Sequence, residues 1–172
     1  INSALDRQLM ATLFEQTDLD ETLIAGGYSK DIYDILLTLS PDQRLRVFSD
    51  ESFLPFFARS SFKDRFPALI ADFSPDQRLS LYAVDGFLTQ FLANYTDRSS
   101  KTTLATDLKN ANRSQSAAVL YSDNAVSALL YAGLSETVLD LVQNLSIAGR
   151  ADFLSNNLQT LVDYNLTDLA LP

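Results

Sequence analysis

The residue types that most often carry out chemistry are scarce in this chain. It contains neither histidine nor cysteine. Ser-His-Asp and Cys-His mechanisms and most zinc sites therefore have no residues to use. Phosphate-binding glycine loops are also missing, and the lone pair Gly26-Gly27 is more typical of a helix end. The 22 acidic residues could supply acid–base pairs, but no spacing marks one of them.

One acidic segment superficially resembles a calcium loop. Asp18 and Asp20 stand two residues apart, and Glu21 follows them. An EF-hand needs glycine at the sixth loop position and glutamate at the twelfth, where this chain has Leu23 and Ser29. We interpret the segment as an acidic helix start. The sequence therefore predicts no catalytic, cofactor-binding or metal-binding residue, and no enzyme; it assigns no binding residue.

The charge of the chain restricts its partners. Its 22 acidic residues outnumber its 13 basic ones, giving a net charge of −9. Nucleic-acid binding depends on neutralising phosphates with Lys and Arg, and anionic membranes attract the same residues. No apolar run is long enough to span a bilayer, and residues 1–20 show no signal peptide. We expect neither a nucleic-acid nor a membrane partner; the compartment stays unassigned, with the cytoplasm slightly favoured.

An internal repeat is the strongest pattern in the sequence. The hexapeptide that begins at Ser40 (Ser-Pro-Asp-Gln-Arg-Leu) recurs letter for letter from Ser74, a period of 74 − 40 = 34 residues. Weaker copies lie on both sides. We therefore expect one helical repeat domain over residues 1–172, cut from a longer protein because it begins with Ile1 rather than Met. Its units are approximately 3–39, 40–73, 74–113 and 114–145, with a partial unit at 146–172.

Each unit has the features of capped amphipathic helices. Ser40 suits an N-cap, Pro41 the first helical position and Asp42 the first turn. Leu45 and Phe48 then fall on one apolar stripe, and Leu79 repeats the Leu45 position. We expect two helices per unit, with three as the alternative. In that case a third helix starts near Pro67.

Three further expectations follow from the repeat. Its phenylalanines recur at helical spacing and are interpreted as core rather than as a docking patch: Phe53, Phe56, Phe57, Phe62, Phe66 and Phe73. Arg44 and Arg78 share one repeat position, where we expect surface pairs between units. The polar stretch from Asn94 to Ser116 is interpreted as a longer loop. The predicted fold class is all-α: units of about 34–37 residues stacked as a short right-handed α-solenoid, with a compact helical bundle as the alternative.

The opening Leu39-Ser40-Pro41-Asp42-Gln43, with its 34-residue period, resembles the helix start of TAL-effector DNA-binding repeats. In those repeats a base-reading loop with a glycine pair follows, and then a lysine that approaches phosphate. The corresponding stretches here, 50–55 and 84–89, contain neither, and they carry acids instead. Because the resemblance covers only about ten residues in each of two units, it assigns the chain to no family.

Two functions fit these observations. The first is a protein–protein interaction scaffold that presents an acidic solenoid surface to a protein or peptide, which the net charge predicts to have a basic face. The second is a structural or assembly module of a longer array or of a homo-oligomer, so self-association is also considered. A clean monomer in light scattering would favour the first function, and a defined oligomer the second.

Overall fold

The computed structural model describes residues 29–50, 53–54, 64–95, 97–164 and 166. Within these residues the protein has ten helices and no strand, so the predicted all-α class is confirmed. The chain divides into two compact units, Ile1–Leu81 and Tyr82–Pro172. The acidic segment at Asp18–Glu21 and the pair Gly26-Gly27 lie outside the described residues, as do Phe56, Phe57 and Phe62.

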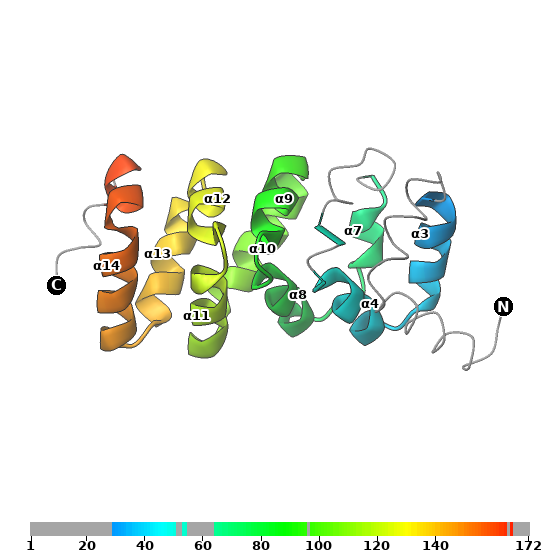
Figure 1. Ribbon diagram of the computed structural model, residues 1–172, viewed down its shortest axis with the longest axis horizontal. Helices are drawn as coiled ribbons and strands as arrows, with labels where there is room; N and C mark the ends of the chain where they lie inside the picture. The colour runs from blue at the N-terminus through cyan, green and yellow to red at the C-terminus, as the bar shows by residue number, and fades with distance from the viewer. Residues whose placement is uncertain (1–28, 51–52, 55–63, 96, 165, 167–172) are drawn as a thin grey trace. The chain divides into compact units, whose positions relative to one another are not determined.

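The first unit contains α3 (Ser29–Thr38), α4 (Pro41–Phe48), α7 (Phe66–Leu69) and most of α8 (Pro75–Tyr82), labelled in Figure 1. Both predicted helix starts are present. Ser40 Oγ accepts from the Gln43 amide at 3.3 Å, and Gln43 Oε1 accepts from the Ser40 amide at 3.0 Å. Ser74 and Gln77 repeat this reciprocal pair at 3.2 and 2.8 Å. Each pair satisfies donors that a helix N-terminus otherwise leaves unbonded.

An aromatic cluster forms the core of the first unit. The Phe48 ring is fully buried, and its centroid lies 5.1, 5.2 and 6.2 Å from those of Phe53, Phe66 and Phe73. All four side chains are 3% exposed or less. These phenylalanines are therefore core, as their spacing predicts. The helix α7 also starts where Pro67 predicts it, with Arg65 as its N-cap residue.

Arg44 departs from the expected surface ladder. Its side chain is buried, its Nη2 donates to both carboxylate oxygens of Asp72 at 2.6 and 2.5 Å, and its guanidinium lies 5.7 Å from the Phe73 ring centroid. At the same repeat position, Arg78 instead donates through Nη1 to the Phe73 carbonyl. The two arginines thus share a sequence position, but these hydrogen bonds join them to different groups.

The repeat position of Leu45 and Leu79 also differs in burial, since Leu79 is 3% exposed whereas Leu45 is only half-buried. We expect Leu79→Ala to lower the free energy of unfolding by about 2–5 kcal/mol. Leu45→Ala leaves a smaller cavity and should cost about 1 kcal/mol. Urea titration followed by circular dichroism measures both. Equal costs would contradict this difference in burial and support the equal burial that the repeat implies.

The second unit contains α9 (Phe87–Asn94), α10 (Arg98–Lys109), α11 (Arg113–Tyr121), α12 (Ala125–Tyr131), α13 (Ser135–Asn144) and α14 (Ile147–Asp163). The helix α13 packs against α10, α11, α12 and α14, while α9 packs against α12. Its core is built from fully buried side chains on all six of these helices: Phe87, Leu104, Leu108, Val119, Leu129, Val138, Leu141 and Phe153.

The loop expected between Asn94 and Ser116 is wrong, because α10 occupies most of it. Asp97 caps this helix by accepting from the amide and the hydroxyl of Ser100, and these bonds lower the pKa of Asp97. Thr102 donates its hydroxyl to the Arg98 carbonyl at 2.8 Å, one turn earlier. The polar side chains thus bond within the helix, while Leu104 is buried.

The default of two helices per unit is also not what the chain adopts after Ser74. Three helices, α8 to α10, follow this residue, and three more, α11 to α13, follow Asn112. Asn112 and Gln115 form another reciprocal cap. The middle helix of each set begins after a residue with positive φ: Gly86 at 73° and Asn124 at 58°. A residue in the left-handed conformation changes the direction of the chain, so the helix before it and the helix after it are separate.

Candidate binding pocket in the second unit

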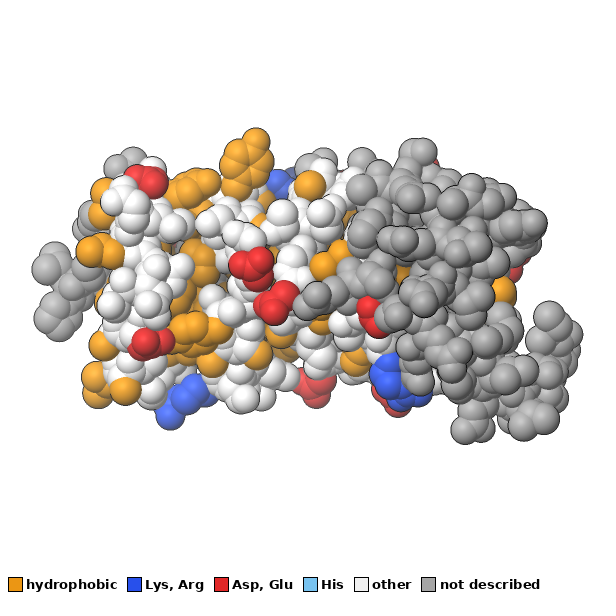
Figure 2. Space-filling model, in the orientation of Figure 1, with side chains coloured by type: hydrophobic (Ala, Val, Ile, Leu, Met, Phe, Trp, Pro, Cys, Tyr) orange, Lys and Arg blue, Asp and Glu red, His pale blue; other side chains and the backbone are white. Residues whose placement is uncertain are grey.

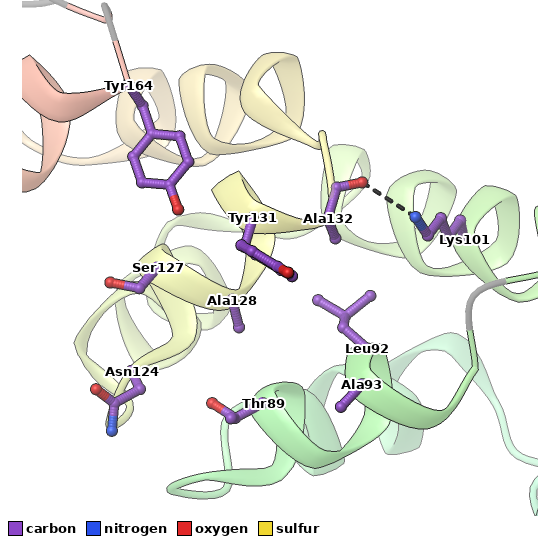
Figure 3. Close-up of a pocket in the computed structure, with 10 residues that line it drawn as sticks. All are labelled: Thr89, Leu92, Ala93, Lys101, Asn124, Ser127, Ala128, Tyr131, Ala132 and Tyr164. Carbon is purple, nitrogen blue, oxygen red and sulfur yellow. Dashed lines mark hydrogen bonds between the residues drawn. The ribbon is translucent and has the colours of Figure 1, made fainter.

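A pocket of about 510 Å³ lies between α9 and α12. We call it the α9–α12 pocket. Residues from α9, α10 and α12 line it, together with the residue that ends α14 (Figure 3): Thr89, Leu92, Ala93, Lys101, Asn124, Ser127, Ala128, Tyr131, Ala132 and Tyr164. This volume lies within the range of sites that bind small molecules or peptide side chains.

The two helices that form the walls are held together at their N-terminal ends. The Asp123 amide donates to Asp85 Oδ1 at 2.8 Å, and the Gly86 amide donates to the Asp123 carbonyl at 3.4 Å. Asp85 and Gly86 precede α9, and Asp123 and Asn124 precede α12. These bonds join the two loops, so the spacing of the pocket walls is set by backbone contacts as well as by side-chain packing.

Small side chains make the pocket hollow. Ala93 on α9 and Ala128 on α12 reach only as far as one methyl group, and Ala132 ends α12. Leu92 is buried at 7% exposure and adds an apolar surface to the pocket. A partner can therefore come close to the helix backbones here, which larger side chains would prevent.

Two tyrosines border this apolar surface. Tyr131, at the end of α12, is 87% exposed, and Tyr164, just after α14, is 40% exposed. Figure 3 shows both rings beside α12, with Leu92 pointing toward Tyr131 from α9 and Tyr164 on the side of α12 that faces α14. Tyrosine is enriched in binding sites because it combines a large apolar ring with a polar tip and few rotatable bonds.

Among the described residues that line the α9–α12 pocket, Lys101 is the one with a charged side chain. Its Nζ donates to the Ala132 carbonyl at 3.1 Å, shown as a dashed line in Figure 3. This bond holds α10 to the C-terminal end of α12 and fixes the ammonium at one end of the pocket. The pocket is thus apolar with a single positive charge, although the chain as a whole is strongly acidic.

A second groove, of about 590 Å³, lies between α10 and α13. Its α10 side carries Arg98, Lys101 and Lys109, whereas its α13 side carries Glu136 and Asp140. Charges of both signs face it, so it offers no uniform potential to a ligand. We regard the α9–α12 pocket as the better candidate site.

Among the described residues, no three acidic side chains lie close enough together to hold a metal ion. None of the helices in the described part of the chain is sufficiently long and apolar to cross a membrane. Thr89 and Ser127 contribute hydroxyls to the pocket, and none of the other lining residues that the structure describes contributes an imidazole or a carboxylate. The arrangement suits recognition of an apolar group.

Sequence reasoning assigned no binding residue and therefore missed all ten residues of the pocket. The alanines look like ordinary helix residues, and a single tyrosine after an apolar stripe looks like core. Only the register could have given a signal: Val126, Leu129 and Leu130 complete the buried stripe of α12, which leaves Tyr131 outside it.

Comparison with known proteins found no match: no protein-family model matches the chain, and no curated protein or solved structure is significantly similar to it.

Proposed function

We propose that this chain is a protein–protein interaction scaffold that binds a protein or peptide partner, anchored in the α9–α12 pocket. The observation that carries this proposal is the exposed Tyr131 beside an apolar pocket lined by alanines. An aromatic ring that is 87% exposed gains most of its burial only when a partner covers it.

The favoured occupant is the apolar face of an amphipathic segment. Such a face places side chains at intervals of three and four residues into a groove between helices. In the α9–α12 pocket, the alanines allow the partner backbone to come close, and the two tyrosines can pack against the partner's apolar side chains. Lys101 favours an acidic residue near the anchor, while the net charge of −9 favours basic residues farther out.

The proposal includes the repeat architecture. Recurrent caps at Ser40, Ser74 and Asn112 support units of three helices, and Ser146 caps a further helix start. We propose that these units stack as a short right-handed solenoid, with a compact bundle as the alternative. A solenoid would repeat the outer surface of its middle helices along the array.

A displayed library of amphipathic peptides tests the proposed function. Selection on the wild-type chain should enrich peptides with a common apolar spacing. These peptides should not bind Tyr131→Ala, so depletion on that variant should leave them in the library. Depletion on Tyr121→Ala should remove them, because Tyr121 lies outside the pocket and its replacement leaves the binding site unchanged. Failure to enrich any peptide, or peptides that bind both variants equally, would refute the proposal.

We also expect negligible binding of duplex DNA near physiological salt. The basic residues of α10 face Glu136 and Asp140 across their groove, so they present no continuous positive stripe. The net charge of −9 adds a general repulsion from phosphates. Fluorescence anisotropy with a labelled duplex at two salt concentrations measures this. Micromolar affinity that falls steeply with salt would instead favour a nucleic-acid partner.

The second candidate function is an assembly module. A specific observation favours it as well: α14 carries the exposed apolar side chains of Ile147, Leu158 and Val162, none of which lines the α9–α12 pocket. Because the two functions use different surfaces, one chain could have both. The molecular mass in solution therefore does not distinguish the two functions, whereas substitutions in one surface at a time do.

A further inference from the structure

The ammonium of Lys101 has donors that its own surroundings do not use. The side chain is half-buried, and its Nζ gives one of its three N–H donors to the Ala132 carbonyl. Among the described residues, no carboxylate forms an ion pair with it. Two donors of the ammonium are therefore open to a partner. Figure 2 shows basic and hydrophobic side chains next to each other near the upper ends of α9 and α12.

The way this ammonium is held distinguishes Lys101 from an ordinary surface lysine. A free surface lysine loses side-chain entropy when it pairs with an acid, so exposed ion pairs contribute little. The bond to the Ala132 carbonyl already fixes Lys101 where α12 ends. A carboxylate that binds there meets a donor in position, which lowers the entropic cost. A partner that fills the apolar pocket also excludes water from the pair and strengthens it.

The other bases of α10 show why Lys101 is singled out. Arg98 and Lys109 line the α10–α13 groove together with Lys101, opposite Glu136 and Asp140. Both Arg98 and Lys109 are exposed, and neither of them lines the α9–α12 pocket. Of these three bases, Lys101 alone places its charge beside the apolar surface that anchors a partner.

The α9–α12 pocket continues beyond Lys101. This side chain lines both the α9–α12 pocket and the α10–α13 groove, so the two hollows meet at it. A partner chain can therefore run past Lys101 instead of stopping there. This continuity favours the side-chain carboxylate of an aspartate or glutamate over a carboxylate at the end of a chain.

The length of α12 sets the distance between the acid and the apolar anchor. The pocket follows α12 from Asn124 to Ala132, eight residues or about 12 Å. Figure 3 shows Lys101 at the Ala132 end, and Tyr131 is the residue before Ala132. An apolar side chain on Tyr131 and a carboxylate on Lys101 are thus about one helical turn apart, which is three or four residues in a helical partner.

We propose that Lys101 determines the specificity of the α9–α12 pocket, and that it selects helical segments with an aspartate or glutamate three or four residues from the apolar anchor. This inference rests on the proposed function of the pocket. The net charge of −9 repels acidic partners in general, so the acid is required at one position and not throughout the segment. The partner is an amphipathic helix with one fixed acidic residue beside its apolar face.

The peptides that are enriched on the wild-type chain test this specificity. They should share an acidic residue at the stated spacing from their apolar anchor. The most enriched peptide is then synthesised with an amidated C-terminus, which removes the terminal carboxylate as a source of charge. Changing its acidic residue to the matching amide should weaken its binding to the wild type about fivefold in isothermal titration calorimetry.

A double-mutant cycle assigns this loss to Lys101. Lys101→Met removes the charge but keeps an unbranched apolar stem, and it should weaken binding of the acidic peptide about fivefold. The amide peptide should bind Lys101→Met and the wild type with affinities within about twofold, because no ion pair remains to be lost. Lys109→Met is the matched control, since it makes the same charge change on α10 outside the pocket. It should leave both affinities unchanged, and a thermal melt checks that each variant is folded.

The outcomes separate this inference from the proposed function. Enriched peptides that depend on Tyr131 but bind equally well as acid and as amide would overturn the role of Lys101 and leave the proposed function intact. This comparison uses only the wild-type chain, so it decides even if Lys101→Met does not fold. An equal loss of affinity in Lys101→Met and Lys109→Met would also count against Lys101. Failure to enrich any peptide would refute both the inference and the proposed function.

Discussion

Replacing Phe48 by alanine is expected to lower the free energy of unfolding by about 3–5 kcal/mol. The Phe48 ring is fully buried and contacts the rings of Phe53, Phe66 and Phe73, so its removal leaves a cavity bordered on several sides by aromatic groups. Short helices such as α7, which has four residues, depend on these contacts because they have few hydrogen bonds of their own. Urea titration followed by circular dichroism and tyrosine fluorescence measures the loss.

Leu37→Ala is the matched control, because Leu37 also lies in the first unit but is 46% exposed. This substitution should change the free energy of unfolding by about 0.5 kcal/mol or less. If Phe48→Ala cost no more than Leu37→Ala, the aromatic cluster would not be the core of the first unit.

Replacing Tyr131 by alanine is expected to weaken the binding of a selected peptide about 30-fold, which corresponds to about 2 kcal/mol. The ring is almost entirely exposed in the free chain, so the substitution removes contacts with the partner and very few contacts within the protein. Stability should therefore stay within about 0.5 kcal/mol of the wild type. Isothermal titration calorimetry gives the affinity, and a thermal melt gives the stability.

Tyr121→Ala serves as the control, since this tyrosine is 47% exposed and lies outside the α9–α12 pocket. Its affinity for the peptide should equal that of the wild type within about twofold. A similar loss of affinity in both variants would show that the α9–α12 pocket is not the docking site.

Local sequence rules predicted the features that depend on neighbouring residues. Ser40 and Ser74 cap their helices with the glutamine three positions later, because a capping box involves only one turn of chain. Pro67 marks the start of α7 for the same reason. The core position of Phe48 follows from its place on an apolar stripe.

Features that depend on competing local interactions were predicted wrongly. The Ser- and Thr-rich stretch after Asn94 is typical of a loop, yet Asp97 caps it and Thr102 bonds to the preceding turn, so it forms α10. Burial of Leu104 decides the outcome, and propensity alone does not include that contribution. The apolar stripe also predicted Leu45 as a core residue, yet its side chain is only half-buried. Its exposure depends on the residues that pack against it in the folded chain.

The pocket could not be predicted from the sequence. It depends on small side chains, and on helices that come together only in the folded chain. Ala93 and Ala128 lie on different helices and are 35 residues apart in the sequence (128 − 93). Each is an ordinary helix former. Lys101 reaches the pocket only because α10 packs near the end of α12, where it donates to the Ala132 carbonyl.

The most direct test of the proposed binding scaffold is nuclear magnetic resonance mapping of a selected peptide on the isotope-labelled chain. If the peptide binds in the α9–α12 pocket, the largest amide shift changes will fall on Thr89, Leu92, Ala128 and Tyr131, and the same residues will show contacts to apolar peptide protons. The amides of Ile147 and Ala151, at the opposite end of α14 from Tyr164, should be unchanged. Shift changes centred on the α10–α13 groove or on α14, with the α9–α12 pocket unaffected, would contradict the proposal.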